Sequence, residues 1–201
     1  YRKMSRKEKA EAKDHGGFVA AEIDGLARKK EKVTARTMIT LDVDKADKDF
    51  LDNYDFLHRY EAVVYTTHSH TPDAPRYRVL IPLVRKITPD ECNAISRYIA
   101  SDMGIDQIDP CSFEPNQVMF WPSCSKDGVY VCKVFDGELL DPDEFLATHP
   151  DWRDVTKLPT APGEKKAFET QQKKQEDPLL KQGIVGDFCR TYSITDVMEG
   201  I

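Results

Sequence analysis

Residues 38–44 constrain the fold more than any other part of this chain, because an apolar stretch ends there in two carboxylates separated by one residue. Side chains alternate between the two faces of a β-strand, so Asp42 and Asp44 would point to the same side. Two like charges held so close resist burial unless a cation lies between them. Oxygen ligands of this kind suit Mg²⁺ or Mn²⁺, ions that commonly hold nucleotide phosphates. A solvated strand end running into the polar residues 45–49 is an equally good interpretation of the motif alone.

The composition predicts a water-soluble, intracellular protein with one core. With 40% hydrophobic and 32% charged residues, the 201-residue chain has enough apolar side chains for one globular domain and some additional chain. No apolar run approaches the roughly 20 residues that span a bilayer, and the charged N-terminus lacks the apolar region of a signal peptide. We therefore expect no membrane partner. Because the chain begins at Tyr1 and stops at Ile201 without an obvious end, we expect a fragment of a longer protein.

The charge and the cysteine content of the chain argue against some classes of function but do not select one. The net charge of −6 argues against a surface coated for non-specific nucleic-acid binding, but basic residues concentrate in 1–32, 76–86 and 165–174, so a locally positive groove remains compatible with it. The cysteines are odd in number, lie at scattered positions and form no Cys-x-x-Cys pair, so the sequence predicts neither a disulfide framework nor a zinc knuckle. We expect five reduced, buried thiols: Cys92, Cys111, Cys124, Cys132 and Cys189.

The pattern of apolar residues predicts a mixed α+β domain. Thr88 followed by Pro89, Asp90 and Glu91 is typical of a helix start, and the turn residues 71–75 predict an antiparallel hairpin whose second strand ends near Pro82. A turn at 125–128 is expected to join the last two strands. The expected helices are 5–14, 47–59, 90–103 and one from 141, and the expected strands are 37–43, 62–67, 76–83, 116–121 and 129–135.

The order strand-helix-strand-strand-helix-strand matches an RRM-like, split βαβ antiparallel sheet with flanking helices. Composition places this domain at 1–155. Residues 156–180 have the Pro, Gly, Lys, Gln and Glu content of a linker. Residues 181–201 regain apolar character, and we expect them to begin a helical segment that leads to a downstream module.

A second cluster of polar residues follows the predicted strand 62–67. His68 and His70 flank Ser69 at the strand end, where binding groups are common. A lone histidine there would more often only hydrogen-bond within the turn. After the turn, Arg76 and Arg78 lie on one face of the next strand, and paired guanidiniums suit phosphate oxygens. Together with the acid pair, this set could bind a metal-chelated triphosphate.

A third carboxylate would complete a metal site, and the sequence offers Asp106 and Asp109, each preceded by isoleucine. We favour Asp109, because it leads through a proline toward the predicted strand 116–121. At least one of the two acids is expected to cap a turn. Lys126, in the turn after that strand, is a weaker candidate for a phosphate or template contact.

Taken together, these motifs resemble the signature of the archaeo-eukaryotic primase (AEP) superfamily: an Asp-x-Asp strand, a Ser/Thr-x-His element and a later apolar-Asp pair. Their order and strand context make the resemblance fairly specific. It covers about residues 13–146, and residues 183–192 resemble the segment before a superfamily 3 helicase. Further stretches resemble the primase-polymerase domains of phage, prophage and plasmid replication proteins: YTTHSH at 65–70, RYRVLIPL at 76–83 and FWPS at 120–123.

The resemblance implies that Asp42, Asp44 and Asp109 hold two Mg²⁺ or Mn²⁺ ions, which would activate a 3′-hydroxyl and stabilise the leaving pyrophosphate. It also implies that His70, with Ser69 and His68, contacts the phosphates of the incoming nucleotide. Which histidine matches the motif is open, since it can be aligned in two ways. Relatives often carry arginine at the position of Gln117, a candidate contact to nucleotide or template.

The implied function is a metal-dependent DNA primase or primase-polymerase, a nucleotidyltransferase in phage or mobile-element replication. Its partners would be single-stranded DNA, nucleoside triphosphates and a downstream helicase domain in the same chain, within the cytoplasm of a bacterial host. Two alternatives remain. One is a catalytically inactive replication-initiation module that binds DNA, and the other is a metal-dependent nuclease or phosphodiesterase.

Overall fold

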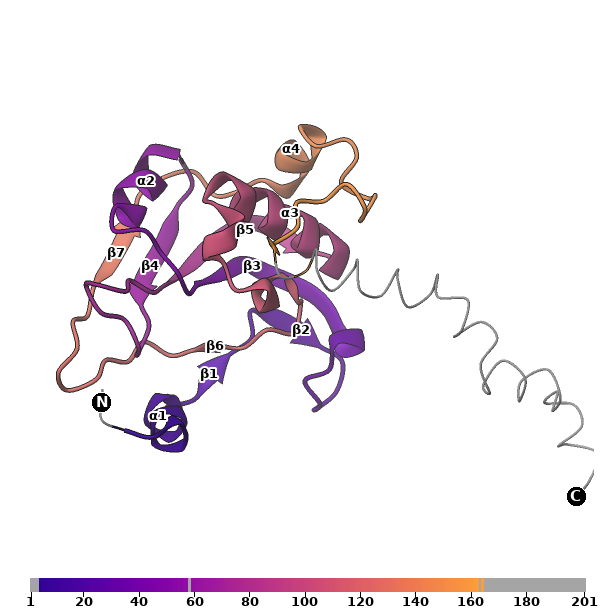
Figure 1. The fold of residues 1–201 in the computed structure, drawn as a ribbon. Helices are drawn as coiled ribbons and strands as arrows, with labels where there is room; N and C mark the ends of the chain where they lie inside the picture. The colour runs from indigo at the N-terminus through magenta and orange to yellow at the C-terminus, as the bar shows by residue number, and fades with distance from the viewer. Residues whose placement is uncertain (1–3, 58, 163, 165–201) are drawn as a thin grey trace, which may run out of the picture. The chain divides into compact units, whose positions relative to one another are not determined.

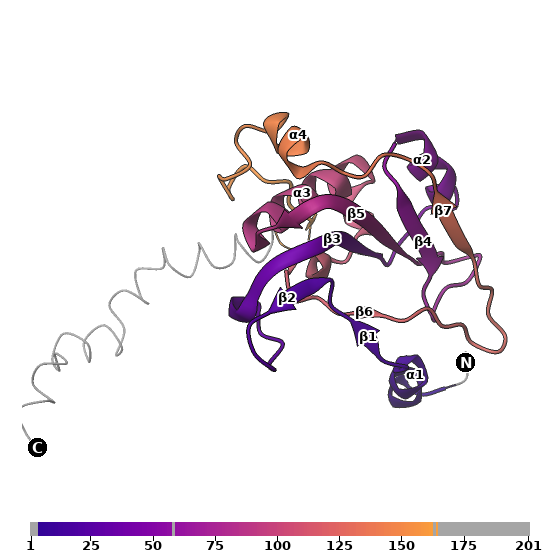
Figure 2. The same cartoon turned by 180° about the vertical axis from the view of Figure 1, so that it is seen from behind.

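A five-stranded sheet forms the centre of the part of the chain that the structure describes (Figure 1). The computed structural model describes residues 4–57, 59–162 and 164, and the chain divides into the units Tyr1–Ala161 and Pro162–Ile201. The sheet belongs to the first unit, and its neighbouring strands are all antiparallel. From one edge to the other (Figure 2), the strands are β2 (Ala21–Ile23), β3 (Val33–Val43), β5 (Tyr77–Ile87), β4 (Ala62–Thr66) and β7 (Cys132–Phe135).

The three central strands confirm the predicted split βαβ pattern. β3 leads through α2 (Phe50–Leu57) to β4, and β5 lies between these two strands and is antiparallel to both. β3 and β4 are therefore parallel to one another but separated by the strand that follows them. The hairpin expected around residues 71–75 is the β4–β5 pair. The α+β class expected from the sequence is confirmed as well.

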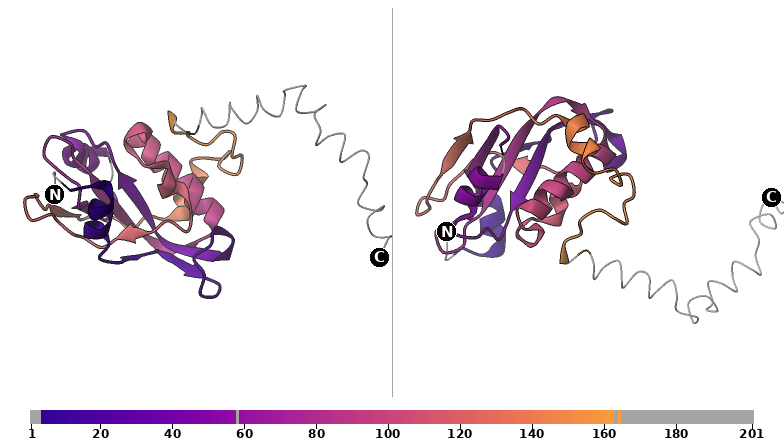
Figure 3. Two further views of the ribbon diagram at one scale, coloured as in Figure 1. Left: turned by 60° about the horizontal axis from the view of Figure 1, so that its bottom comes forward. Right: turned by 90° about the horizontal axis from the view of Figure 1, so that it is seen from above.

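One face of the sheet carries the hydrophobic core. Ile39, Leu41 and Val43 alternate along β3, and all three are fully buried. Burying such a side chain stabilises a fold by about 1.5–3 kcal/mol. α3 (Pro89–Asp102) packs across this face, and its start is a capping box between Thr88 and Glu91, as the sequence predicted. Seen from above, α2, α3 and α4 (Pro142–Ala147) lie in front of the sheet (Figure 3).

The opposite face is covered by a chain segment, residues 115–121, whose carbonyl groups accept hydrogen bonds from Arg36, Tyr65 and Arg78 of the sheet. Within it β6 (Met119–Phe120) pairs with β1 (Gly17–Phe18) in a separate two-stranded sheet. Figure 1 shows this pair and α1 (Arg6–Lys13) on the side of the main sheet away from α2 and α3. Arg36 lies fully buried beneath the segment and donates to the carbonyl of Pro115 at 2.9 Å.

Two strand predictions need correction. β5 does not end at Pro82 but continues to Ile87. A proline cannot donate to the sheet, so the pairing with β3 is interrupted there by a register shift and then resumes. The strands predicted at 116–121 and 129–135 are shorter than expected and do not pair with each other, because β6 joins β1 and β7 joins β4.

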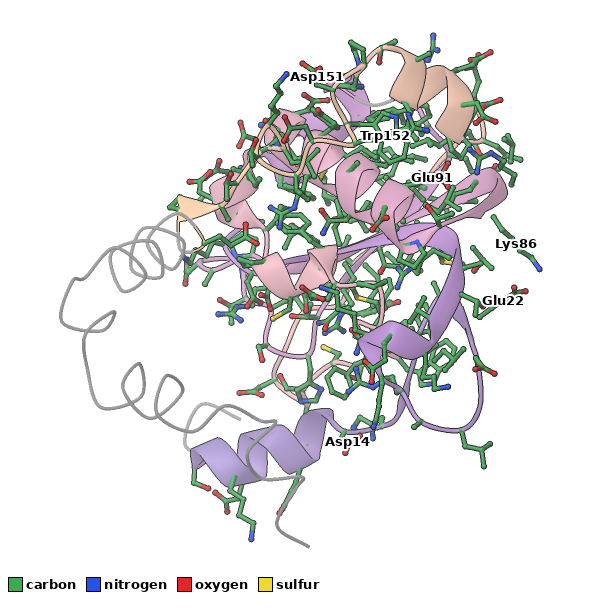
Figure 4. The ribbon with its side chains drawn as sticks, turned by 90° about the vertical axis from the view of Figure 1, so that its right-hand side faces the viewer. Asp14, Glu22, Lys86, Glu91, Asp151 and Trp152 are labelled. Atoms are coloured by element: carbon green, nitrogen blue, oxygen red, sulfur yellow. The ribbon has the colours of Figure 1, made fainter. Side chains whose placement is uncertain are left out.

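The β2 edge is tied to the sheet by an ion pair that crosses β3. Figure 4 shows Glu22 of β2 and Lys86 of β5 pointing toward one another, and their side chains form a salt bridge. Both side chains are exposed, so the pair adds at most about 1 kcal/mol to stability. The pair joins β2 to β5 across the intervening strand β3.

The cysteine prediction is wrong for three of the four cysteines in the described residues. Cys92 is buried, whereas Cys111, Cys124 and Cys132 are exposed, and all four are free thiols. Cys189 lies outside the described residues. The prediction depended on the usual burial of free cysteines, but Cys111 lies in the 3₁₀ helix η3 (Pro110–Phe113), Cys124 in a loop and Cys132 on the edge strand β7.

The chain remains packed beyond the predicted domain end at residue 155. Leu158 and Ala161 are buried, and Arg97 of α3 donates to the carbonyl of Pro159 at 2.9 Å. Most of the predicted linker and all of the predicted segment 181–201 lie outside the described residues. Across the described residues, no helix combines the length and apolarity that crossing a membrane requires.

Candidate active site

A cavity of about 250 Å³ opens where β3 ends and β5 begins. It gathers chain segments that are far apart in sequence, and it includes eight of the residues singled out as site candidates. His70, Lys126 and Asp106 are candidates that do not line it. The lining residues are Asp42, Asp44, Thr67, His68, Ser69, Arg76, Arg78, Asp109, Gln117, Val118, Phe120 and Ser123.

The antiparallel register places the two acids opposite the two arginines. Asp42 and Arg78 are directly paired across β3 and β5, and Arg78 Nη2 lies 3.4 Å from Asp42 Oδ2. One step further, Arg76 Nη1 lies 2.8 Å from Asp44 Oδ1. The two pairs differ in environment: the side chains of Arg78 and Asp42 are 9% and 14% exposed, whereas those of Arg76 and Asp44 are 37% and 41% exposed.

Asp42 is the electrostatic centre of the cavity. Burial raises the pKa of its carboxyl group, and repulsion from Asp44 and Asp109 adds to that rise, while the Arg78 guanidinium opposes it. Its Oδ1 atom is buried and accepts no hydrogen bond from the described residues. One guanidinium therefore compensates this carboxylate only in part, and a further cation would stabilise it.

Asp109 reaches the cavity because its backbone is attached to the end of β3. Its N–H donates to the carbonyl of Asp42 at 2.8 Å, and Val43 and Ile108 form an antiparallel bridge. Its Oδ1 accepts from the N–H of Cys111 at 3.0 Å, at the start of the 3₁₀ helix η3 (Pro110–Phe113). The structure thus brings Asp109 beside Asp42, and the same residue caps a turn.

Asp106 lies on the 3₁₀ helix η2 (Ile105–Gln107), where it is exposed and does not line the cavity. Of the two acids that the sequence offered as a third carboxylate, only Asp109 shares the cavity with Asp42 and Asp44. Asp106 is therefore a matched control for experiments on the acidic residues.

The two histidines have different surroundings. His68 lines the cavity, and its Nδ1 shares a hydrogen bond of 3.0 Å with Ser123 Oγ. His70 is buried outside the cavity lining, and its Nδ1 accepts from the N–H of Arg76 at 3.1 Å. Burial lowers the pKa of His70. A neutral His70 therefore orders the turn that leads into Arg76, whereas His68 is the imidazole that faces the cavity.

Phe120 belongs to the cavity wall, a role that sequence reasoning missed. Its carbonyl accepts from Tyr65 Oη at 2.9 Å and from Arg78 Nη1 at 3.2 Å, so the side chains of the sheet hold this segment in place. Thr67, Val118 and Ser123 also line the cavity without having been predicted. The sequence signal for this contact was the presence of two polar side chains, Tyr65 and Arg78, in the otherwise apolar strands β4 and β5. The two residues are paired across these strands.

Comparison with known proteins identifies the family. Residues 1–161 match the VapE N-terminal domain family. The chain belongs to the VapE N-terminal domain family. No curated protein matches this VapE N-terminal domain.

Among solved structures, the VapE N-terminal domain is similar to the AEP domain of the cyanophage S-2L primase-polymerase (PrimPol). The two share 15% sequence identity with a TM-score of 0.49, and the match covers 72% of this chain and 76% of that chain.

The donor set of the VapE N-terminal domain fits a hard divalent cation. Asp42, Asp44 and Asp109 offer oxygen atoms alone, and one Asp42 oxygen is buried without a hydrogen-bond donor. In the described part of the chain, however, no three His, Cys, Asp or Glu side chains already stand in a metal-binding arrangement. Arg76 and Arg78 instead compensate the charge of two of these acids. Side chains would therefore have to move before three of these carboxylates could share one ion.

Proposed function

We propose that this domain is a metal-dependent nucleotidyltransferase, a primase or primase-polymerase that extends nucleic acid on a single-stranded DNA template. The observation that supports it best is the convergence of three carboxylates, a histidine, a serine and two arginines on one cavity. A solvated strand end, the alternative for the acid pair, does not explain why Asp42 is 14% exposed beside two other carboxylates.

Asp42, Asp44 and Asp109 are the residues that would hold Mg²⁺ or Mn²⁺. The chemistry that such ions supply is activation of a hydroxyl nucleophile and neutralisation of charge on the leaving pyrophosphate. Asp42 is fixed for this task by its strand, since its N–H donates to Ser112 Oγ at 2.8 Å and its carbonyl accepts from Asp109. The site would therefore need little backbone rearrangement to bind an ion.

The two arginines would serve different roles. The Arg76 side chain is 37% exposed, and within the described part of the chain its one salt bridge is to Asp44, so its guanidinium could turn to the phosphates of a nucleoside triphosphate. Arg78 is held by Asp42 and by the carbonyl of Phe120, so it would position the acid and the cavity wall.

The remaining candidate residues would contact the phosphates of a bound nucleotide, or the nucleic acid beside it. His68 and Ser69 would donate to phosphate oxygens, and Gln117 would contact the nucleotide or the template. His70 would act indirectly, by ordering the backbone of Arg76. Lys126 lies on an exposed turn outside the cavity lining and would contact only a longer template strand. A helicase domain further along the same chain stays part of the proposal.

The test is templated nucleotide incorporation on single-stranded DNA with Mn²⁺ or Mg²⁺. We expect Asp44→Asn and Asp109→Asn each to lower incorporation by about 10²-fold or more, because each removes a charged ligand. Asp106→Asn should leave it unchanged. Equal activity in all three variants would refute the proposal.

The same assay separates the two alternatives. Metal-independent DNA binding without incorporation by the wild-type chain would indicate the inactive DNA-binding module. Degradation of the DNA in the absence of nucleoside triphosphates would indicate the nuclease. The same strand, labelled at its 5′ end, serves in all three measurements: incorporation, degradation without nucleoside triphosphates, and binding in EDTA.

A further inference from the structure

Trp121 is a large aromatic residue left half exposed on the rim of the cavity. Its neighbour Phe120 lines the cavity, as does Ser123 two residues later, so the cavity wall flanks Trp121 on both sides in sequence. The side chain is nevertheless 50% exposed, although the preceding Met119 is fully buried. Packing within the domain therefore leaves half of this large apolar side chain in contact with water.

The indole is held in a fixed position from behind. The backbone N–H of Trp121 donates to the carbonyl of Gly16 at 3.1 Å, which fixes the chain at this residue. The indole ring itself contacts the ring of Phe18, with a centroid separation of 4.9 Å and an interplanar angle of 36°. Gly16 has a φ of +81°, and a Cβ atom there would lie 3.5 Å from Trp121 Cδ1. β1 and its turn thus support one side of the ring and leave another side open.

The turn that supports Trp121 also reaches the cavity. His15 directly precedes Gly16, and its ring lies 6.2 Å from that of His68, which lines the cavity. The exposed indole therefore lies against the same turn that brings His15 near a residue of the cavity lining. A single exposed apolar side chain would need no explanation elsewhere on the protein.

We propose that Trp121 is a stacking platform for a base of a single-stranded nucleic acid that enters the cavity. Bases in a single strand present free π-faces, and an aromatic side chain binds them with little sequence preference. The bases of a duplex are stacked on each other and offer no such face. The identity of the ligand rests on the proposed function, but the contact itself does not depend on metal or on catalysis.

The chain contains two tryptophans, so Trp121 can be observed on its own. Trp152 contacts Arg153 and packs against the core, and Figure 4 shows it at the opposite end of the domain from Asp14, which directly precedes His15. The Trp152→Phe variant leaves Trp121 as the sole indole. Its fluorescence is measured while a short oligothymidylate or oligouridylate is added, in EDTA and without nucleoside triphosphate.

We expect the oligonucleotide to quench the fluorescence of Trp121 in a saturable way, and to leave Trp152 unchanged in a Trp121→Phe variant. Trp121→Ala should weaken binding of a fluorescently labelled oligothymidylate by about 5- to 100-fold, whereas Trp121→Phe should retain most of it. If the alanine variant does not fold, as judged by circular dichroism, the quenching measurement decides alone. No quenching at saturating oligonucleotide overturns this inference, and so does unchanged affinity in a folded alanine variant.

Failure of this inference and failure of the proposed function give different results. Quenching without nucleotide incorporation would support the platform and refute the enzyme. Metal-dependent incorporation without quenching would support the enzyme and refute the platform.

Discussion

Replacing Arg78 by methionine tests whether the buried Asp–Arg pair organises the cavity. The substitution keeps most of the side-chain volume but removes the guanidinium that faces Asp42 across the two strands. The Asp42 carboxylate would then lie among two other acids without a counterion. Removing one partner of a buried ion pair typically costs about 3–5 kcal/mol. The carbonyl of Phe120 would keep only its hydrogen bond from Tyr65.

This loss is large compared with the roughly 5–15 kcal/mol that stabilises a domain. For a domain of this size it corresponds to a Tm lower by roughly 6–20 °C. Arg76→Met is the matched control, because it removes the neighbouring ion pair, whose partners are 37% and 41% exposed. Such a pair contributes about 0–1 kcal/mol, so its Tm should change by no more than about 4 °C.

The assay is thermal and urea unfolding, followed by circular dichroism at pH 7 in EDTA. Asp42→Asn in the Arg78→Met background removes the uncompensated charge and should recover part of the lost stability. Equal losses in the two arginine variants would refute the reasoning, because they would mean that burial of the Arg78 pair has no energetic effect. So would a double variant that is no more stable than Arg78→Met alone.

Three further outcomes follow from the same geometry. An ion that binds only the folded state stabilises it, so Mn²⁺ at about 100 times its Kd should raise the free energy of unfolding of the wild type by about 2.7 kcal/mol and that of Asp44→Asn by less. Equal gains in both proteins would show that Asp44 does not bind the ion. Because the pKa of Asp42 is raised, the folded state holds this proton more tightly than the unfolded state does. Stability should therefore fall as the pH rises from the ordinary carboxyl pKa of about 3.9 toward the raised pKa of Asp42. Urea unfolding across this pH range should show a weaker dependence on pH for Asp42→Asn than for the wild type. In Gly17→Ala, the new Cβ would lie 2.6 Å from the Met119 carbonyl oxygen, so β1 and β6 must separate at a cost of about 1–3 kcal/mol; unchanged urea unfolding would show that this contact relaxes freely.

The parts of the site that sequence predicted depend on short-range periodicity. Alternation along a strand is enough to place Asp42 and Asp44 on one face, and the same rule places Arg76 and Arg78 together. Local turn chemistry and helix-start signals fixed the order of the elements, and hence the split βαβ core. Asp109 was favoured over Asp106 for its position before a strand, and the structure places it beside Asp42.

The parts that were missed depend on contacts between distant segments. The register of β3 against β5 decides that each arginine faces an acid, and no local pattern encodes this register. The pairing of β6 with β1 joins residues about a hundred positions apart, and no local pattern indicates such a pairing. The burial of His70 likewise follows from the packing of its turn, and not from its neighbours in sequence.

The Asp–Arg pairs also account for how an acidic site can fold before any cation binds. Without Arg78, the buried Asp42 would repel Asp44 and Asp109 with no compensation. In the proposed function, an ion would bind beside these guanidiniums, and the two pairs differ in how firmly they are held. Arg76 is partly exposed and has one acidic partner among the described residues, whereas Arg78 is also held by the carbonyl of Phe120. Opening at Asp44 would free Arg76 for a phosphate while leaving Arg78 to hold the cavity wall.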